Sequence, residues 1–244
     1  MHHVVLERWS RGQSPLHRCD PRAKTLALLM FLTLVATSHT RVVPLGAAYF
    51  CLLVAALVWA RLPPAAALAR SGVVLPFSLV FAGISLLAGD AARAVALLVK
   101  SYLSALAVLL LISTTPMPQL LRGLETLGVP RFLLMVAQFL YRYLFVISEE
   151  AQHMRAAGLA RGASVRGMMA HGARFRAAAG ALAVLFARSY ARAEDIHQAM
   201  LARGFQGRFH LRSAARFRWQ DALFLCAVGG LAGGLRWAAE RALP

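Results

Sequence analysis

Long runs without a charged residue dominate the first half of the chain. They cover residues 25–40, 42–60 and 71–89, and a fourth run covers residues 101–121. A helix needs about 20 residues to cross the ~30 Å hydrocarbon core of a membrane, and it can cross with about 17. The pattern therefore predicts four transmembrane helices within residues 25–112.

A fifth apolar run begins at about residue 219. It contains two overlapping Gly-x-x-x-Gly pairs, formed by Gly229 with Gly233 and by Gly230 with Gly234. Small residues on one helix face allow a second helix to approach closely. We therefore expect the last segment, 219–244, to hold a tightly packed transmembrane helix.

The segment between these spans, residues 113–218, has a different composition. It holds fifteen arginines against five acidic residues, and its apolar runs at 132–141 and 177–187 are only ten and eleven residues long. Runs of this length are typical of interfacial or core helices. If they were spans, the arginine-rich stretch 155–176 would lie on the outer face, against the positive-inside rule. The segment is therefore predicted to be a cytoplasmic, largely helical domain that lies against the membrane.

These runs together predict an all-α integral membrane protein with about five transmembrane helices and a cytoplasmic domain inserted before the last one. The N-terminal segment, 1–24, is then cytoplasmic, and the C-terminus lies outside. Arg236 and Arg241 oppose this orientation, but the twelve arginines within 149–218 outweigh them.

Prolines and glycines divide the cytoplasmic domain. Pro116 and Pro118 end the fourth span, because proline cannot continue a helix and restricts the residue before it. A short helix stops before Gly128, and Pro130 suits the first position of the next helix. Two long helical stretches are then expected, over 131–161 and over 165–201 with a break near 189–193.

The tetrapeptide Leu-Ala-Arg-Gly occurs twice, at 159–162 and 201–204, and the second arginine lies 42 positions after the first. Ordinary helix ends account for it, because glycine is common just past a helix end and arginine in the last turn complements the helix dipole. A docking function uses the same geometry: an arginine at a helix tip offers five donors to an acidic or carbonyl-lined groove. Two similar tips suit two similar partner subunits, and both interpretations stay open on these residues alone.

The strongly basic composition raises the question of nucleic-acid binding. The formal net charge is +17, 59% of the residues are hydrophobic and the mean hydropathy is +0.60. Nucleic-acid binding requires recognition motifs or aromatic residues patterned among the basic ones, and the arginines here show no such pattern. They border apolar spans instead, as the positive-inside rule describes.

Three common nucleotide-binding, metal-binding and redox motifs are absent from the sequence. There is no GxxxxGK[ST] loop, no HExxH and no CxxC, so no catalytic residue is predicted, and any ATP that drives this protein is bound by another polypeptide. Cys19, Cys51 and Cys226 form neither a disulfide framework nor a metal cluster, and we interpret them as structural. His2 and His3 follow Met1, and no metal site is predicted there.

Two further groups of charged residues have structural interpretations. Lys100 lies at the start of the fourth span, where we expect its ammonium group to snorkel to the outer boundary. Asp20 lies among Arg18, Arg22 and Lys24. We expect these four to form an ion-pair cluster that holds the N-terminal segment against the cytoplasmic helices.

Four motifs in this order resemble the transmembrane T component of energy-coupling-factor (ECF) transporters, the EcfT/CbiQ family. SPLHRCDPRAK (14–24) resembles the family's motif at the start of the first span, although Cys19 stands where leucine is more typical. STTPMPQLLRGLETLGVP (113–130) resembles its cytoplasmic linker. YRYLFVISEEAQHMRAAGLARG (141–162) and AMLARGF (199–205) resemble its first and second coupling helices.

The resemblance implies a non-catalytic subunit in the inner cell membrane, between two ABC ATPases and a small, CbiM-like substrate-binding membrane subunit. ATP and magnesium are bound by the ATPases, and this chain holds no cofactor. Closing of the ATPases moves the coupling helices, whose apolar faces pass the movement to the substrate-binding subunit. The residues expected to dock on the ATPases are Ala160, Arg161, Gly162, Ala202, Arg203 and Gly204.

Alternatives remain open for the transported cargo and for the class of protein. The CbiQ branch serves cobalt or nickel uptake, and the alternative is a transporter of biotin or another vitamin. A membrane-embedded lipid-modifying enzyme is a different class, in which the basic domain would hold anionic head groups. That function requires an acid–base or nucleophilic group near the interface, and only Glu149 and Glu150 suit the position.

Overall fold

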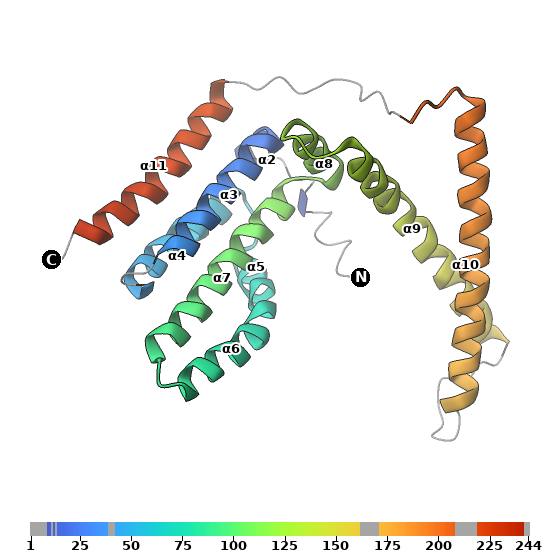
Figure 1. Cartoon of the computed structure of the whole chain (residues 1–244), viewed down its shortest axis with the longest axis horizontal. Coiled ribbons are helices and arrows are strands. Elements are labelled where there is room, and N and C mark those ends of the chain that lie inside the picture. The colour runs from blue at the N-terminus through green and yellow to red at the C-terminus, as the bar shows by residue number, and fades with distance from the viewer. Residues whose placement is uncertain are drawn as a thin grey trace. The chain divides into compact units, whose positions relative to one another are not determined.

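The computed structural model describes residues 9–10, 12, 14–38, 42–161, 171–207 and 219–241, and within these ranges every regular element is a helix (Figure 1). The all-α prediction is therefore confirmed. The chain divides into two compact units, one of residues 1–128 and 214–244 and the other of residues 129–213. We call the first the bundle unit and the second the two-helix unit.

The bundle unit is organised around α3 and α7. The helix α3 packs against α7, α8 and α11, while α7 also packs against α4, α5 and α6. The described elements of this unit are α2 (Pro15–Arg18), α3 (Pro21–Thr37), α4 (Val42–Trp59), α5 (Pro64–Ser71), the 3₁₀ turn η1 (Gly72–Val74), α6 (Leu75–Leu87), α7 (Ala91–Thr114), α8 (Met117–Thr126) and α11 (Trp219–Arg241).

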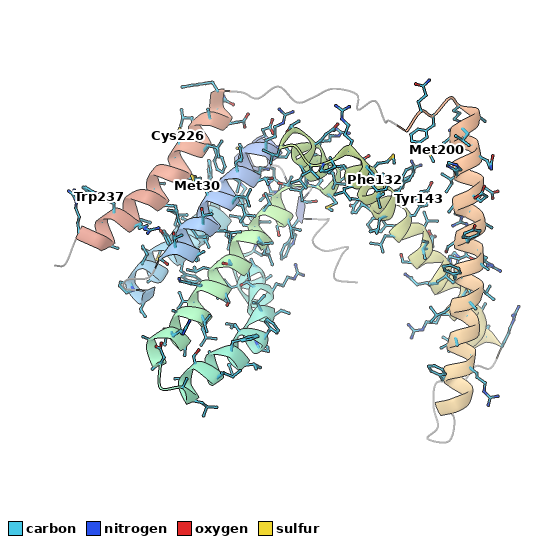
Figure 2. The ribbon with its side chains drawn as sticks, in the orientation of Figure 1. Met30, Phe132, Tyr143, Met200, Cys226 and Trp237 are labelled. Atoms are coloured by element: carbon cyan, nitrogen blue, oxygen red, sulfur yellow. The ribbon has the colours of Figure 1, made fainter. Side chains whose placement is uncertain are left out.

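Apolar side chains of α3, α4, α7 and α11 form the core of the bundle unit. The ring of Phe31 meets the ring of Tyr49 edge to face, with centroids 5.3 Å apart, and the Tyr49 hydroxyl donates to the Ala232 carbonyl over 3.2 Å. Gly229 lies so close to α3 that a Cβ atom there would meet Met30 Cε at 2.8 Å. Figure 2 shows Met30 between the two helices. Gly229 therefore leaves room for the end of the Met30 side chain between α3 and α11.

The predicted transmembrane character is confirmed, with a correction to the third span. Four helical stretches are long and apolar enough to cross a membrane: Pro64–Leu87, Ala91–Thr114, Arg131–Ala160 and Trp219–Ala239, while Val43–Trp59 is a shorter apolar helix. The third span starts earlier than the predicted residue 71, because Pro64 begins a helix that η1 carries into α6. One of the four, Arg131–Ala160, lies in the segment predicted to be cytoplasmic: its uncharged run is short, but the whole helix is long and apolar enough to cross. The cytoplasmic placement of this helix and the total of five spans stay predictions.

The two-helix unit contains α9 (Arg131–Ala160) and α10 (His171–Ala202). The predicted extent of α9 is confirmed. The predicted break near 189–193 is wrong, because α10 is continuous and the Ser189 hydroxyl donates to the Leu185 carbonyl within the helix, over 2.7 Å. Residues 165–170, where this helix was expected to begin, lie outside the described residues.

Candidate functional site

The first Leu-Ala-Arg-Gly copy lies at the end of α9. The last helical residue is Ala160, and the Arg161 amide still donates to the Ala157 carbonyl over 3.2 Å. Both Ala160 and Arg161 are exposed. Gly162 lies outside the described residues. An exposed arginine therefore caps the helix, as the motif predicted.

The second copy ends α10 in a closed turn. The Gly204 amide donates to the Leu201 carbonyl over 2.9 Å, and the Phe205 amide donates to the Met200 carbonyl over 3.0 Å. Gly204 has a φ of +77°, in the left-handed region that favours glycine. These two bonds form a Schellman motif, which satisfies carbonyls that the helix end leaves free. Residues 202–204 are all exposed, so the arginine of this motif lies on a well-defined helix tip.

The two tips belong to helices that cross. The helices α9 and α10 pack together, and Arg188 of α10 forms an ion pair with Glu150 of α9. Figure 1 shows the C-terminal ends of the two helices leaving this crossing in different directions. Arg161 lies 11 residues beyond Glu150, about 16 Å along the helix, and Arg203 lies 15 residues beyond Arg188, about 22 Å. The tips are therefore separate points of contact.

The first half of α9 exposes large apolar side chains. Phe132, Leu133 and Leu140 are 66%, 56% and 65% exposed, and Figure 2 shows Phe132 and Tyr143 along this helix. Contiguous apolar surface of this kind marks a contact with a membrane or with another protein. The same helix thus carries an apolar surface and a charged tip.

The N-terminal motif folds onto itself around His17. The Nε2 atom of His17 lies 3.0 Å from the Trp9 carbonyl oxygen, and its Nδ1 atom lies 2.6 Å from Ser14 Oγ. A carbonyl oxygen can only accept, so Nε2 donates to Trp9, while Nδ1 faces the Ser14 hydroxyl. Both ring nitrogens are therefore occupied by structural hydrogen bonds.

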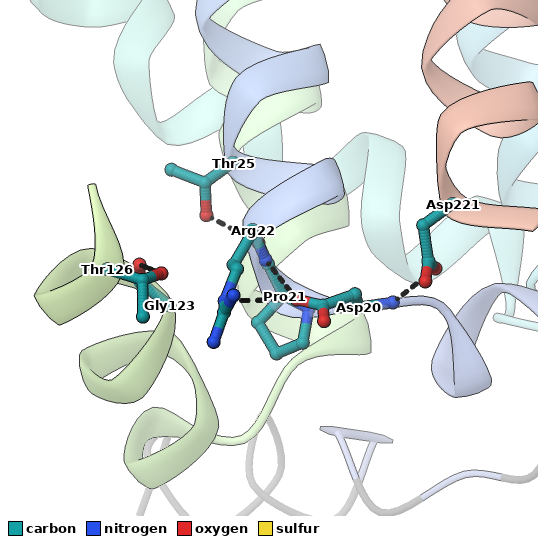
Figure 3. A network of polar contacts seen from close by, with 7 residues as sticks. All are labelled: Asp20, Pro21, Arg22, Thr25, Gly123, Thr126 and Asp221. Carbon is teal, nitrogen blue, oxygen red and sulfur yellow. Dashed lines mark hydrogen bonds and ion pairs between the residues drawn. The ribbon is translucent and has the colours of Figure 1, made fainter. Parts of the chain in front are cut away.

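Asp20 joins the start of α3 to the start of α11 (Figure 3). Its carboxylate accepts from the Arg22 amide over 2.9 Å, and its own amide donates to Asp221 Oδ1 over 2.8 Å. The two aspartates are 7% and 5% exposed. On the other side of this junction, a Cβ atom on Gly123 of α8 would lie 3.2 Å from Pro21 Cβ. Three helices thus meet at the N-cap of α3.

Lys24 joins the same junction to the end of α7. It is 5% exposed, and its ammonium group donates to the Thr114 carbonyl over 3.1 Å and to the Thr115 hydroxyl over 3.3 Å. The last carbonyls of a helix lack partners within the helix, so a buried ammonium group is well placed there. The predicted ion-pair cluster is therefore corrected. Arg22 Nε lies 3.9 Å from Asp20 Oδ1, whereas the Lys24 ammonium group bonds to the end of α7. The side chain of Arg18 lies outside the described residues, so its part in the cluster stays a prediction.

Two cations hold the opposite end of α3. Lys100 Nζ donates to the Ala36 carbonyl over 3.0 Å, and Arg236 donates to the Thr37 hydroxyl over 2.6 Å and to the Thr37 carbonyl over 3.5 Å. These carbonyls belong to the last turn of α3, where the helix dipole favours positive charge. Lys100, predicted to snorkel, thus has an acceptor on α3. The structure also gives a packing reason for Arg236, which opposed the predicted orientation.

Disulfide bonds do not join the three cysteines. Cys19 is partly buried, whereas Cys51 and Cys226 are exposed. Burial raises the pKa of the Cys19 thiol, so it stays neutral and weakly nucleophilic near pH 7. Among the described ranges, no three His, Cys, Asp or Glu side chains gather as metal ligands. His2 and His3 lie outside those ranges, and the interpretation of both stays a prediction.

Comparison with known proteins agrees with this arrangement. The sequence model of the cobalt transport protein family CbiQ matches residues 12–212. The cobalt transport protein CbiQ of Rhodobacter capsulatus is 32% identical over 134 residues, which are 54% of this chain and 52% of that protein. The chain thus aligns with about half the length of this relative. The family match includes the N-terminal motif and both arginine tips.

Proposed function

The chain belongs to the CbiQ family of cobalt transport proteins, and from this premise we propose that it is the coupling subunit of an ECF-type ABC importer. Cobalt is the proposed cargo, with nickel as the second possibility. In this proposal the chain itself is non-catalytic. Two ABC ATPases hydrolyse ATP on the cytoplasmic side, and a separate small membrane subunit binds the ion.

The pair of exposed arginine tips is the observation that carries the proposal. Arg161 and Arg203 end two different helices, in the same local sequence, at separate points. A guanidinium group donates up to five hydrogen bonds in a fixed plane, which suits a groove lined with carboxylates or carbonyls. One tip for each of two similar ATPases explains why the motif occurs twice.

Movement of the ATPases would reach the membrane through the crossed helices. The helices α9 and α10 pack together, and the ion pair between Glu150 and Arg188 adds to this contact, so a displacement of one tip would shift both helices. The exposed apolar surface on the first half of α9 is the part we assign to the substrate-binding subunit. A helix transmits displacement along its axis because its hydrogen bonds make it stiff.

The proposed orientation places the N-terminus and the two-helix unit in the cytoplasm and the bundle unit in the inner membrane. The junction around Lys24 supports it, because the start of α3, the end of α7 and the start of α11 lie at one end of the bundle. That arrangement is required if the segment between α7 and α11 stays on one side of the membrane.

The test replaces the two tip arginines with alanine, alone and together, in the complete transporter. A hydrogen bond to a charged group contributes about 1.5–3 kcal/mol, so each change should lower ATPase affinity by roughly 10- to 100-fold. The effects should add, because the tips are separate. Arg155→Ala and Arg192→Ala are matched controls, since both arginines are exposed on the sides of the same helices.

The measurements are co-purification of the ATPases in mild detergent and cobalt uptake by cells. Loss of both in the double variant, with both control variants unchanged, supports the coupling function. Wild-type uptake and wild-type ATPase retention in the Arg161→Ala/Arg203→Ala double variant would show that the tips are ordinary helix ends and that the proposal is wrong.

A further inference from the structure

A long apolar groove runs along the side of the bundle unit. It has a volume of about 890 Å³ and lies between α3, α7 and the stretch from α5 to α6. Its wall includes Phe77 and Phe81, whose rings meet edge to face 5.2 Å apart and are 71% and 50% exposed. A groove with such exposed apolar walls opens to the surroundings of the bundle, which in a membrane are lipid chains.

One cation lines this otherwise apolar groove without serving a helix end. Arg70 rests on the ring of Trp9, with Cζ 4.1 Å from the ring centroid. Its Nη1 atom is buried and has no hydrogen-bond acceptor among the described residues. Lys100 also lines the groove, but it donates to the Ala36 carbonyl. A charged donor without an acceptor is costly, and Arg70 lines the groove, so an anion that enters the groove would supply the guanidinium group with an acceptor.

The position of Arg70 fits the head-group level of a membrane. It lies six residues after Pro64, about 9 Å from the start of that helix, within the reach of a snorkelling arginine. The indole beneath it belongs to the N-terminal segment, and tryptophan is enriched at membrane interfaces. An anion at Arg70 therefore comes from the head-group region on the side of the N-terminus.

The length of the groove fits an acyl chain. On α7 it reaches from Leu97 to Ile112, which is 15 residues or about 22 Å of helix. One leaflet contributes about 15 Å of hydrocarbon, so the groove covers the depth of a leaflet. Arg70 supplies one charged contact at this groove, and the walls supply apolar contacts along its length.

We propose that this groove holds one anionic phospholipid, with its phosphate at Arg70 and an acyl chain along α7. Arginine binds phosphate through paired, charge-assisted hydrogen bonds. The lipid would then fill the space between α3, α6 and α7 and fix the N-terminal segment through Trp9. This site needs no ATPase and no cargo, so its test is independent of the coupling function.

Native mass spectrometry of the full chain in mild detergent tests the proposal, with phosphatidylglycerol and phosphatidylcholine as the two probes. The wild type should retain one phosphatidylglycerol on the order of tenfold more tightly than Arg70→Gln, as expected for the loss of a charge-assisted bond. Arg93→Gln removes the same charge from an exposed position and should retain the lipid. Arg70→Lys should lie between the wild type and Arg70→Gln.

A second variant addresses the groove without touching the arginine. Ala105 lines the wall, and Ala105→Trp should fill the groove and lower phosphatidylglycerol retention to the same extent, so the test survives if Arg70→Gln fails to insert. Equal retention of both lipids by the wild type and both groove variants would overturn the proposal. Displacement of phosphatidylglycerol by inorganic phosphate alone would also overturn it, because the groove would then contribute nothing to binding.

Discussion

Gly204→Ala is the most direct test of how the second arginine tip is built. Gly204 has a φ of +77°, and two backbone hydrogen bonds, from its own amide and from the Phe205 amide, close the end of α10. Nothing lies within 4 Å of a Cβ atom built on this glycine. The substitution therefore creates no clash among the described residues, and any effect must come from the backbone conformation.

The magnitude follows from that conformation. A residue with a Cβ atom loses roughly 1–2 kcal/mol in the left-handed region. Since 1.4 kcal/mol corresponds to a factor of ten, the closed turn should open about 5- to 30-fold more often. Opening releases the Phe205 amide from the Met200 carbonyl and frees Arg203 from its fixed position.

Hydrogen–deuterium exchange resolved to single residues measures this opening in the purified chain. The Phe205 amide should exchange about 5- to 30-fold faster in Gly204→Ala, in line with the strain. Gly204→Asn should show a smaller change, because asparagine tolerates the left-handed region. Gly180→Ala is the matched control. Gly180 lies inside α10 with open space around it, and alanine there should strengthen the helix by up to about 1 kcal/mol.

Unchanged exchange at Phe205 in Gly204→Ala would refute this reasoning. The left-handed glycine would then not be what closes the helix end. Equal acceleration in Gly204→Ala and Gly204→Asn would also contradict it, because the effect would follow from any side chain and not from the backbone angle.

Two further changes test the packing of α11. Asp221→Ala removes the acceptor of the buried Asp20 amide and should lower the free energy of unfolding by about 1.5–3 kcal/mol, which is measured as a lower thermal midpoint in detergent. Asp221→Asn keeps an acceptor oxygen and should lower the midpoint less. Equal midpoints for both variants would exclude the hydrogen bond as the cause. Gly229→Leu pushes against Met30 and should cost about 1–3 kcal/mol in the same assay. Gly230→Leu points into open space and should leave the midpoint unchanged, so equal losses in both glycine variants would contradict close packing at this position.

Much of the fold follows from local sequence. Apolar runs and proline positions predicted the all-α class, the extent of α9 and the end of α7 near Pro116. The start of the third span was missed because Arg70 interrupts the uncharged run, although the helix continues through it. Charge content marks the limits of an apolar run, whereas a helix ends only where its hydrogen bonds end.

The polar contacts of the bundle were beyond prediction from the sequence. Asp20 and Asp221 are separated by 201 residues, and no local pattern pairs them. Lys24 was expected beside Asp20 because the two are close in sequence, but its long side chain reaches the free carbonyl at the end of α7. Which carbonyl a cation reaches depends on how the helices pack, and a single sequence does not fix that.

The candidate site was easier to predict because it repeats a local signal. Leu-Ala-Arg-Gly carries its own termination chemistry, so both helix ends fall where the motif placed them. The Glu150–Arg188 contact was missed. Its signal was an acidic pair within a strongly basic segment, which we considered only as a possible acid–base group near the interface.

The boundary between the two units has a practical consequence for engineering. The helix α8 belongs to the bundle through its contact with Pro21, and the chain leaves that body at Gly128, whose φ is +93°. The two-helix unit, residues 129–213, is therefore one continuous segment that carries both arginine tips, and the chain enters it next to this glycine. Under the proposed coupling function, exchanging this segment between family members would change which ATPases bind, while the bundle unit keeps its own sequence.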